Sequence, residues 1–396
     1  MLRSLYDKGY GIECFLDRSD FKQLTVDDIA KMICAEVDAY TLSSRLRRTE
    51  QFGPDIRKRA MRFLEKPEFG LQTPFGFINE YMHGLCPNDL TMIGGLSNSG
   101  KGRFLMHLLV WLVAKEGQKV CLLSNEMTGE DFFKALVCTM MNLPGLYGKR
   151  LKIKQGDIVQ SRFKDENGAY IERNENEDAQ AFSQRLMLES PEYKTYTEIL
   201  DWWEENFSDR FLFVSVADDY STARLKREIR MAKDRGCSVI AYDTLKSYQS
   251  TEWGDLVQAA TDLSEMIKAD EQGITGLATF QLTDDVAIGT PDELGSLKIA
   301  RARHIMHLAD NMIMFMHLNS WQKKLYALQN EELDEAWGEG AWMILPDDKN
   351  IAAFRLVKNR RGGGKEKIFA VQTNLDYNRW EPIGELIRNE KQSKAG

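Results

Sequence analysis

The sequence predicts an α/β fold, a mostly parallel twisted sheet flanked by helices, with a short helical N-terminal extension. Three observations support this prediction. Short apolar strands alternate with helical patterns from about residue 71, a glycine-rich turn joins the first of these strands to a long apolar helix, and the residues before 71 are charged with helical spacing. The alternation favours parallel pairing because each crossover helix covers one face of the sheet.

The N-terminal extension, residues 1–70, has the pattern of two helices. Thr25 is a suitable cap for a helix over 25–33, and a second, basic helix is expected over 55–64. An extension of this length is too short to form a hydrophobic core of its own. Its apolar side chains are therefore expected to pack on the same chain or on a neighbouring subunit, as an oligomerisation segment.

The main domain is expected over 71–385, and its strands are short apolar runs. Two polar stretches, at about 145–210 and 319–350, interrupt the pattern and are interpreted as insertions, and 386–396 as a polar tail. The expected strands are Leu90–Ile93, Val120–Ser124, Phe211–Val216, Ser238–Tyr242, Gly276–Phe280 and Asn311–Met316, followed by a hairpin-rich end at Ala352–Lys358 and Lys367–Thr373.

Composition limits the possible classes of protein. Of 396 residues, 43% are hydrophobic, enough for a large core, yet no run approaches the ~20 apolar residues of a membrane span. The six cysteines form no CxxC pair, and the N-terminus does not resemble a signal peptide, so a cytoplasmic protein with reduced thiols is expected. A net charge of −8 argues against nucleic-acid binding through overall charge, but not against a locally basic channel.

The glycine-rich turn, Gly95–Lys101, fits the pattern GxxxxGK of a phosphate-binding loop. Its backbone N–H groups and lysine would hold the phosphates of ATP, and the next position normally supplies a Ser or Thr hydroxyl to Mg²⁺. Here that position is Gly102, so water or the Ser99 hydroxyl would have to replace the ligand, and efficient hydrolysis stays open. The expected nucleotide-binding residues are Gly95, Asn98, Ser99, Gly100, Lys101, Gly102 and Arg103.

Polar side chains follow three further strands. Asp243 would hold Mg²⁺, Glu126 would activate the attacking water, and Gln281 would sense the γ-phosphate. Each alone could also be an ordinary cap or solvated residue. The carboxyl ends of parallel strands meet at one edge of a sheet, where α/β proteins bind ligands, so we expect the three to converge there.

In order, the motifs resemble those of the ATPase domain of DnaB-type replicative helicases, a hexameric branch of the RecA-like ATPases. The similarity covers about 72–385 without the insertions. It rests on Ser124-Asn-Glu126-Met127, Ile240-Ala-Tyr-Asp243, Phe280-Gln281-Leu282, Ala309-Asp310-Asn-Met-Ile-Met-Phe315 and Val357-Lys358-Asn-Arg360-Arg-Gly362, besides the phosphate loop.

The resemblance implies a RecA-like fold and a ring of identical subunits, expected to be a hexamer, with ATP and Mg²⁺ between neighbours. Glu126 would be the catalytic base, and Lys358 and Arg360 would reach the ATP of the adjoining subunit. The sequence departs from the family at Gly102, at Thr283-Asp284, where a basic residue is common, and in its first 70 residues, which do not resemble the family's collar domain.

The resemblance also implies loops that contact single-stranded DNA, at 246–255 and 284–293, but neither is strongly basic. A basic cluster lies at 298–304 and could equally be a solvated face. We therefore consider an ATPase that translocates on or unwinds DNA in replication, and a nucleotide-switched scaffold that recruits a protein partner through 145–210 without unwinding. A recombinase-like binder of single strands is a third alternative; its affinity would fall steeply with salt.

Overall fold

The structure is a computed structural model. It divides the chain into two units, Met1–Glu68 and Phe69–Gly396. The residues it describes are 25, 28, 31–32, 56–65, 69–143, 151–217, 219, 221–245, 253–268, 273–281, 289–295 and 306–389.

In the first unit, the expected cap and the expected basic helix are both present. The Thr25 hydroxyl accepts a hydrogen bond from Asp28 N at 3.2 Å and donates to Asp28 Oδ2 at 2.7 Å. The basic helix is α4, Ile56–Glu65. Its side chains Ile56 and Leu64 are 66% and 75% exposed, so α4 presents apolar surface as well as positive charge.

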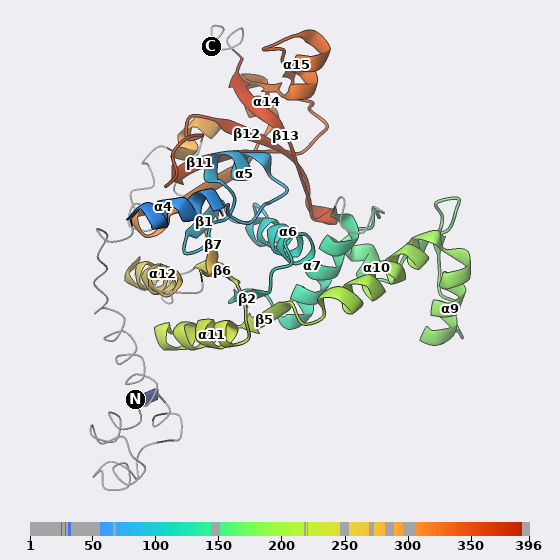
Figure 1. Ribbon diagram of the computed structural model, residues 1–396. Helices are drawn as coiled ribbons and strands as arrows, with labels where there is room; N and C mark the ends of the chain where they lie inside the picture. The colour runs from blue at the N-terminus through green and yellow to red at the C-terminus, as the bar shows by residue number, and fades with distance from the viewer. Residues whose placement is uncertain are drawn as a thin grey trace. The chain divides into compact units, whose positions relative to one another are not determined.

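The second unit is built on one 11-stranded sheet in the order β10-β9-β13-β12-β11-β8-β1-β7-β6-β2-β5, which confirms the predicted fold class (Figure 1). Strands β8, β1, β7, β6, β2 and β5 pair in parallel, as the alternation with helices predicts. Their bounds are β1 Leu90–Gly95, β2 Val120–Ser124, β5 Phe211–Ser215, β6 Val239–Leu245, β7 Thr275–Gln281 and β8 Asn311–His317.

The rest of the sheet is antiparallel and comes from the C-terminal part of the chain. Its strands are β9 Tyr326–Gln329, β10 Met343–Ile344, β11 Ile351–Asn359, β12 Ile368–Asn374 and β13 Arg379–Arg388. Segment 319–350, expected as an insertion, contains helices α14 Ser320–Leu325 and α15 Glu331–Trp337 and adds β9 and β10 to the sheet edge. The strand β13 includes 386–388, which the sequence assigned to the polar tail.

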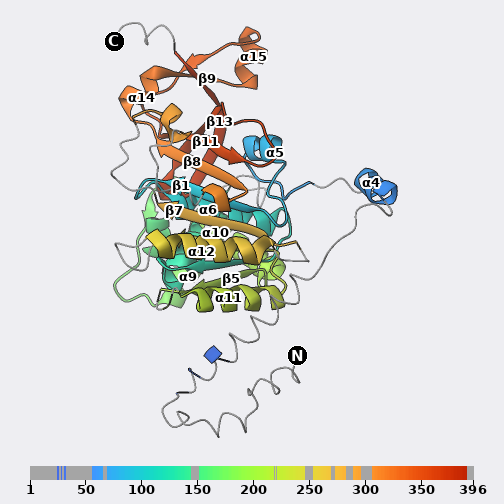
Figure 2. The ribbon, with the colours of Figure 1, turned by 90° about the vertical axis from the view of Figure 1, so that its left-hand side faces the viewer.

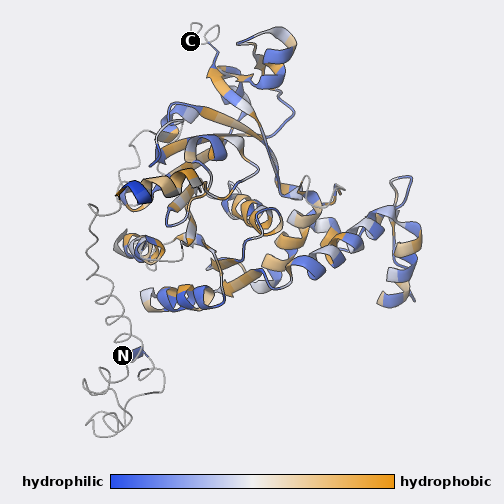
Figure 3. Ribbon diagram, in the orientation of Figure 1, coloured by the Kyte–Doolittle hydropathy of each residue, from blue (hydrophilic) through white to orange (hydrophobic). Residues whose placement is uncertain are grey.

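Helices cover both faces of the parallel half. On one face lie α6 Lys101–Ala114 and α7 Gly129–Asn142, and on the other α11 Thr222–Asp234 and α12 Trp253–Lys268, which face the viewer in Figure 2. Helix α5 Gly76–Met82 covers the antiparallel half instead, where Phe77 packs on Phe354 of β11 and Phe369 of β12. Val120 and Leu122 of β2 point into the first core, and Cys121 and Leu123 into the second. The strands are therefore apolar on both sides. Figure 3 shows α6 as hydrophobic along most of its length, whereas α11 is largely hydrophilic.

Between β2 and β5 the chain forms a mostly helical segment. It contains α8 Gln155–Val159, the small hairpin β3 Phe163–Lys164 and β4 Tyr170–Ile171, α9 Ala179–Glu189 and α10 Pro191–Phe207. The Ser190 hydroxyl caps α10, whose first residue is proline, and Ile199 and Trp203 are buried in the first core. Helix α9 lies at the far end of this segment from the sheet (Figure 1). None of the described helices is long and apolar enough to span a membrane.

Candidate functional site

The phosphate loop lies between the end of β1 and the start of α6, as predicted. Asn98 and Gly100 both have left-handed backbone, with φ of 55° and 86°. Such a conformation is easy for glycine and tolerable for asparagine. The loop can therefore turn sharply into α6, and the N–H groups in the first turn of a helix can stabilise an anion.

Lys101 is the first residue of α6 and is buried, with 8% of its surface exposed. Its Nζ donates a hydrogen bond to the carbonyl of Leu96, 2.8 Å away in the same loop. The ammonium group therefore lies over the loop, where an ammonium can neutralise a bound phosphate.

The structure explains why the next position is glycine. A Cβ built on Gly102 would lie 2.6 Å from Asp243 Oδ2, closer than nonbonded atoms approach. The carboxylate of Asp243 thus occupies the space that a Ser or Thr side chain would need. The hydroxyl expected at this position is replaced in space by a carboxylate oxygen from β6.

Asp243 is held from its other side. The hydroxyls of Thr244 and Thr279 lie 2.9 and 2.6 Å from Asp243 Oδ1. Burial raises the pKa of the Asp243 carboxyl, and the nearby Glu126 charge raises it further, whereas the two hydroxyls and the Lys101 charge lower it. A positive ligand beside Oδ2 would therefore be stabilised by a carboxylate that already has a fixed orientation.

The ends of the parallel strands bring the predicted residues together at one edge of the sheet, called here the carboxyl edge. Gly95 of β1 pairs with Gln281 of β7, and Asp243 of β6 pairs with Ser124 of β2. Glu126 lies two residues beyond Ser124, and both Glu126 and Gln281 are exposed. The predicted convergence of the three strand ends is present in the structure.

Two polar residues at this edge were not found from the sequence. The side chain of Asn125 accepts from Thr244 N at 3.0 Å and donates to Thr244 O at 2.7 Å, tying the turn before Glu126 to β6. His317, at the end of β8, has Nε2 2.9 Å from the carbonyl of Ser99. A polar residue ending an apolar strand was the available signal for His317. Nothing in the sequence marks Asn125 as a link between strands.

The turn after β12 packs on the phosphate loop. It is the short helix η3, Leu375–Tyr377, and the Leu375 carbonyl accepts a hydrogen bond from Arg103 Nη1 at 2.6 Å. A Cβ on Gly100 would lie 3.0 Å from Leu375 Cδ2 and 3.2 Å from Trp380. Arg103, predicted to bind nucleotide, thus holds the C-terminal hairpin against the loop.

Below this turn, His107 of α6 is fully buried, with Nδ1 3.3 Å from the carbonyl of Asn378. Burial lowers the pKa of His107 to about 4. Phe104 packs on Phe354 and Trp380, with ring centroids 5.0 and 5.3 Å apart. These contacts fix the first two turns of α6, and with them the loop, against the antiparallel half of the sheet.

Lys358 and Arg360 lie elsewhere. Because β11 is antiparallel to β8, with Asn359 opposite Asn311, both cations lie where the parallel strands begin, called here the amino edge. Lys358 Nζ donates to the carbonyls of Met306 and Ala309 at 2.6 and 2.7 Å. Burial lowers the pKa of Lys358. A phosphate loop and these cations of the same subunit are therefore at opposite edges of one sheet.

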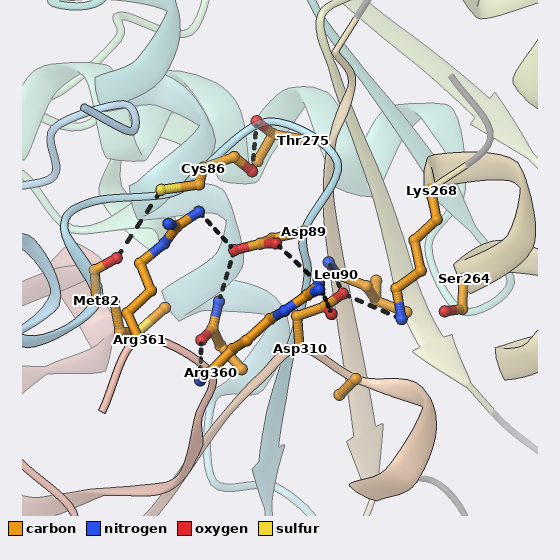
Figure 4. A network of polar contacts seen from close by, with 12 residues as sticks. Met82, Cys86, Asp89, Leu90, Ser264, Lys268, Thr275, Asp310, Arg360 and Arg361 are labelled. Atoms are coloured by element: carbon orange, nitrogen blue, oxygen red, sulfur yellow. Dashed lines mark hydrogen bonds and ion pairs between the residues drawn. The ribbon is translucent and has the colours of Figure 1, made fainter. Parts of the chain in front are cut away.

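Arg360 belongs to a polar network at the amino edge, shown in Figure 4. Its Nη1 lies 2.8 Å from Asp310 Oδ1 and 3.9 Å from Asp89 Oδ1. Arg361 Nη2 lies 3.3 Å from Asp89 Oδ2. Burial raises the pKa of Asp89, and the charge of Arg361 lowers it.

The predicted DNA-contacting segments lie largely outside the described residues. Of the loop 246–255, the described part begins the helix α12, and of 284–293 it includes Gly289, Thr290 and the start of η2, Pro291–Gly295. The basic cluster at 298–304 lies wholly outside the described residues.

The chain is similar in fold to solved structures. One similar solved structure is an ATPase domain; it is 14% identical, with a TM-score of 0.56, covering 84% of this chain and 99% of its own. A second, "The Structure Of A DnaB-Like Replicative Helicase And Its Interactions With Primase", is 14% identical, with a TM-score of 0.54, covering 95% and 79%. At these identities the likeness concerns the fold. No curated protein matches the chain.

The family comparison covers the parts that build both edges of the sheet. The model of the DnaB-like helicase C terminal domain matches residues 70–366, from just before α5 to the turn that follows Arg360 and Arg361. The match therefore includes the phosphate loop, all the parallel strands and β11. The chain belongs to the family of DnaB-like helicase C-terminal domains.

Proposed function

We propose that this protein is an ATPase that works as a ring of identical subunits, with ATP bound at the carboxyl edge of one subunit and completed by Arg360 of the next. The proposal rests on the positions of the two half-sites, the phosphate loop and Arg360. The phosphate loop lies at the carboxyl edge and Arg360 at the amino edge of the same sheet. One subunit cannot bring its own Arg360 to its own phosphate loop. A head-to-tail contact between copies can, and such contacts form a ring when the rotation between copies closes.

Within one subunit, the roles follow from the geometry. Lys101 and the N–H groups of the loop would bind the β- and γ-phosphates. Glu126, exposed beside Asp243, would accept the proton of the attacking water, and Gln281, level with Gly95 on the neighbouring strand, would contact the γ-phosphate. The developing charge would be stabilised by Lys101 and by the neighbour's arginine.

The residues at the carboxyl edge fit a magnesium ion. Asp243 presents Oδ2 toward the loop, and the Ser99 hydroxyl is buried without a partner among the described residues. Both are hard oxygen donors. The described residues contain no cluster of three or more His, Cys, Asp and Glu that could hold a metal. Nucleotide-bound magnesium needs no such cluster, because phosphates and water supply most of its ligands. When bound, the ion would neutralise charge on the phosphates.

Of Lys358 and Arg360, the two residues predicted to reach the neighbour's ATP, Arg360 is the better candidate. Its side chain is 63% exposed, whereas the Lys358 ammonium is bound to main-chain carbonyls of its own subunit. Lys358 would have to give up these hydrogen bonds to reach a phosphate. We therefore assign Lys358 to holding the amino edge together and Arg360 to catalysis.

We further propose that hydrolysis drives movement along single-stranded DNA or unwinding of a duplex, as family membership suggests. A second candidate is a nucleotide-switched scaffold with slow turnover. It is favoured by Gly102, because the hydroxyl that usually binds magnesium is missing. A forked duplex with a fluorescent strand separates the two, since only the first candidate displaces the strand when ATP is added.

The test of the shared site is ATP turnover against protein concentration. Turnover per subunit should rise as subunits assemble, and Arg360→Ala should lower kcat by about 1,000-fold or more while nucleotide affinity changes little. Arg361→Ala is the matched control, since Arg361 is the adjacent arginine and contacts Asp89; it should keep most of the turnover. Full activity in dilute monomers, or in Arg360→Ala, would refute the shared site.

A further inference from the structure

We propose that Asp310 is the positioning residue for the cation that each subunit offers to its neighbour. In this view Asp310 fixes the guanidinium of Arg360 at the amino edge before the neighbouring ATP arrives. The inference rests on the proposed function, in which Arg360 acts across the subunit contact.

The contact joins one buried and one exposed side chain. Arg360 Nη1 binds Asp310 Oδ1 at 2.8 Å, and Asp310 is 5% exposed while Arg360 is 63% exposed. The guanidinium is thus anchored at one corner by a buried charge, and the rest of the side chain lies at the surface. A mobile arginine loses side-chain entropy when it meets a phosphate, and an arginine that is already held loses less.

Asp310 is itself immobilised. Its Oδ2 accepts a hydrogen bond from Leu90 N at 3.0 Å and lies 3.3 Å from Lys268 Nζ, and its own N–H donates to the Leu90 carbonyl at 2.9 Å (Figure 4). Leu90 is the first residue of β1, and Gly95, the last, begins the phosphate loop. The two half-sites are therefore fixed to the two ends of the same buried strand.

The neighbouring carboxylate does not have this role. Asp89 Oδ1 is 3.9 Å from Arg360, whereas Asp89 Oδ2 lies 3.3 Å from Arg361 Nη2. Asp89 is as well buried as Asp310 and lies in the same network, but its shorter contact is to Arg361. The pair Asp89 and Asp310 thus provides a control and a test at one location.

The experiment is a double-mutant cycle of Asp310→Asn and Arg360→Ala, measured as kcat, ATP affinity and assembly mass. Asparagine keeps the shape of the side chain and an oxygen for Leu90 N–H, but loses the charge beside Arg360. We expect Asp310→Asn to lower kcat by about 10- to 100-fold with nucleotide affinity unchanged. In the Arg360→Ala background it should cause no further loss, because Asp310 acts through Arg360. Asp89→Asn should lower kcat by less than about threefold.

The outcomes separate the two proposals. Wild-type activity in Arg360→Ala would overturn the shared site itself. Loss in Arg360→Ala with full activity in Asp310→Asn, or equal losses from Asp310→Asn in both backgrounds, would overturn only the positioning role. If Asp310→Asn does not assemble, Asp310→Glu, which keeps the charge but displaces it, is run through the same cycle and judged by the same criteria.

Discussion

The carboxyl edge and the amino edge of the sheet carry different kinds of polar chemistry. At the carboxyl edge, Glu126 and Gln281 are exposed near a glycine-rich loop that leads into the first turn of α6, and the N–H groups of such a turn can bind an anion. At the amino edge, Arg360 and Lys358 already have partners within their own subunit. In the proposed function, the carboxyl edge receives phosphates and the amino edge presents a cation in a fixed position. This difference favours head-to-tail assembly, because a cation held at the amino edge of one subunit can meet a phosphate bound at the carboxyl edge of the next.

The largest effect should come from removing Glu126, the proposed base at the carboxyl edge. Glu126→Gln keeps the size of the side chain but cannot accept a proton, so kcat should fall by about 100- to 10,000-fold while ATP binding persists. Steady-state turnover and equilibrium binding of a fluorescent ATP analogue measure the two quantities. Glu130→Gln, in the first turn of α7, removes a nearby carboxylate that pairs with Lys134 and should leave turnover intact. Comparable losses in both variants would show that the site has been misassigned.

A smaller effect should follow from filling the space above Gly102. Because a Cβ there would lie 2.6 Å from Asp243 Oδ2, Gly102→Ser should displace the carboxylate rather than restore a ligand. The two hydroxyls on Oδ1 oppose that movement. Affinity for magnesium–nucleotide should fall by about tenfold or more, as overpacking costs imply.

Gly102→Ala separates bulk from chemistry, since it adds the same Cβ without a hydroxyl. Titration of Mn²⁺ in the presence of ADP, followed by electron paramagnetic resonance, gives the metal affinity without turnover. Equal weakening in both variants would support the steric account. Tighter metal binding in Gly102→Ser than in wild type would mean that Asp243 moves aside and the hydroxyl coordinates.

The smallest effect on turnover, but a clear one on stability, concerns His107 behind the phosphate loop. Its pKa is about 4 in the folded protein and about 6.5 when unfolded, so the unfolded chain takes up the proton first as the pH falls. The stability present above pH 6.5 should therefore be lost toward pH 4, by about 2 kcal/mol between pH 7 and pH 5. Urea unfolding of wild type and His107→Gln at both pH values measures this, and an equal acid loss in both proteins would contradict it.

The sequence was most informative for the buried parallel strands, whose hydrophobic pattern is local. The parallel strands are apolar on both faces, so each reads as a short hydrophobic run, and β2 was predicted with its observed bounds. Asp243, Glu126 and Gln281 could be placed together because the ends of parallel strands share an edge. That reasoning needs topology but no side-chain coordinates.

What the sequence could not supply depends on contacts between distant residues. Strand β13 was missed because Arg379–Arg388 mixes charged and apolar residues, as suits a strand that is only partly buried. The steric reason for glycine at position 102 could be seen only once the side chain of Asp243, 141 residues further along the chain, was placed beside it. Asp310 lies just before β8 and Arg360 just after β11, and the two residues meet because these strands pair in an antiparallel register. That register cannot be predicted from the sequence of either strand.

We propose that two subunits share one catalytic site, and mixing two inactive variants tests this most directly. Lys101→Ala removes the phosphate contact and keeps the arginine, and Arg360→Ala does the reverse. Each alone should be inactive. A one-to-one mixture, shown by native mass spectrometry to contain mixed rings, should recover about a quarter of wild-type turnover per subunit, because one contact in four pairs an intact loop with an intact arginine. Mixed rings that stay inactive would contradict a shared site.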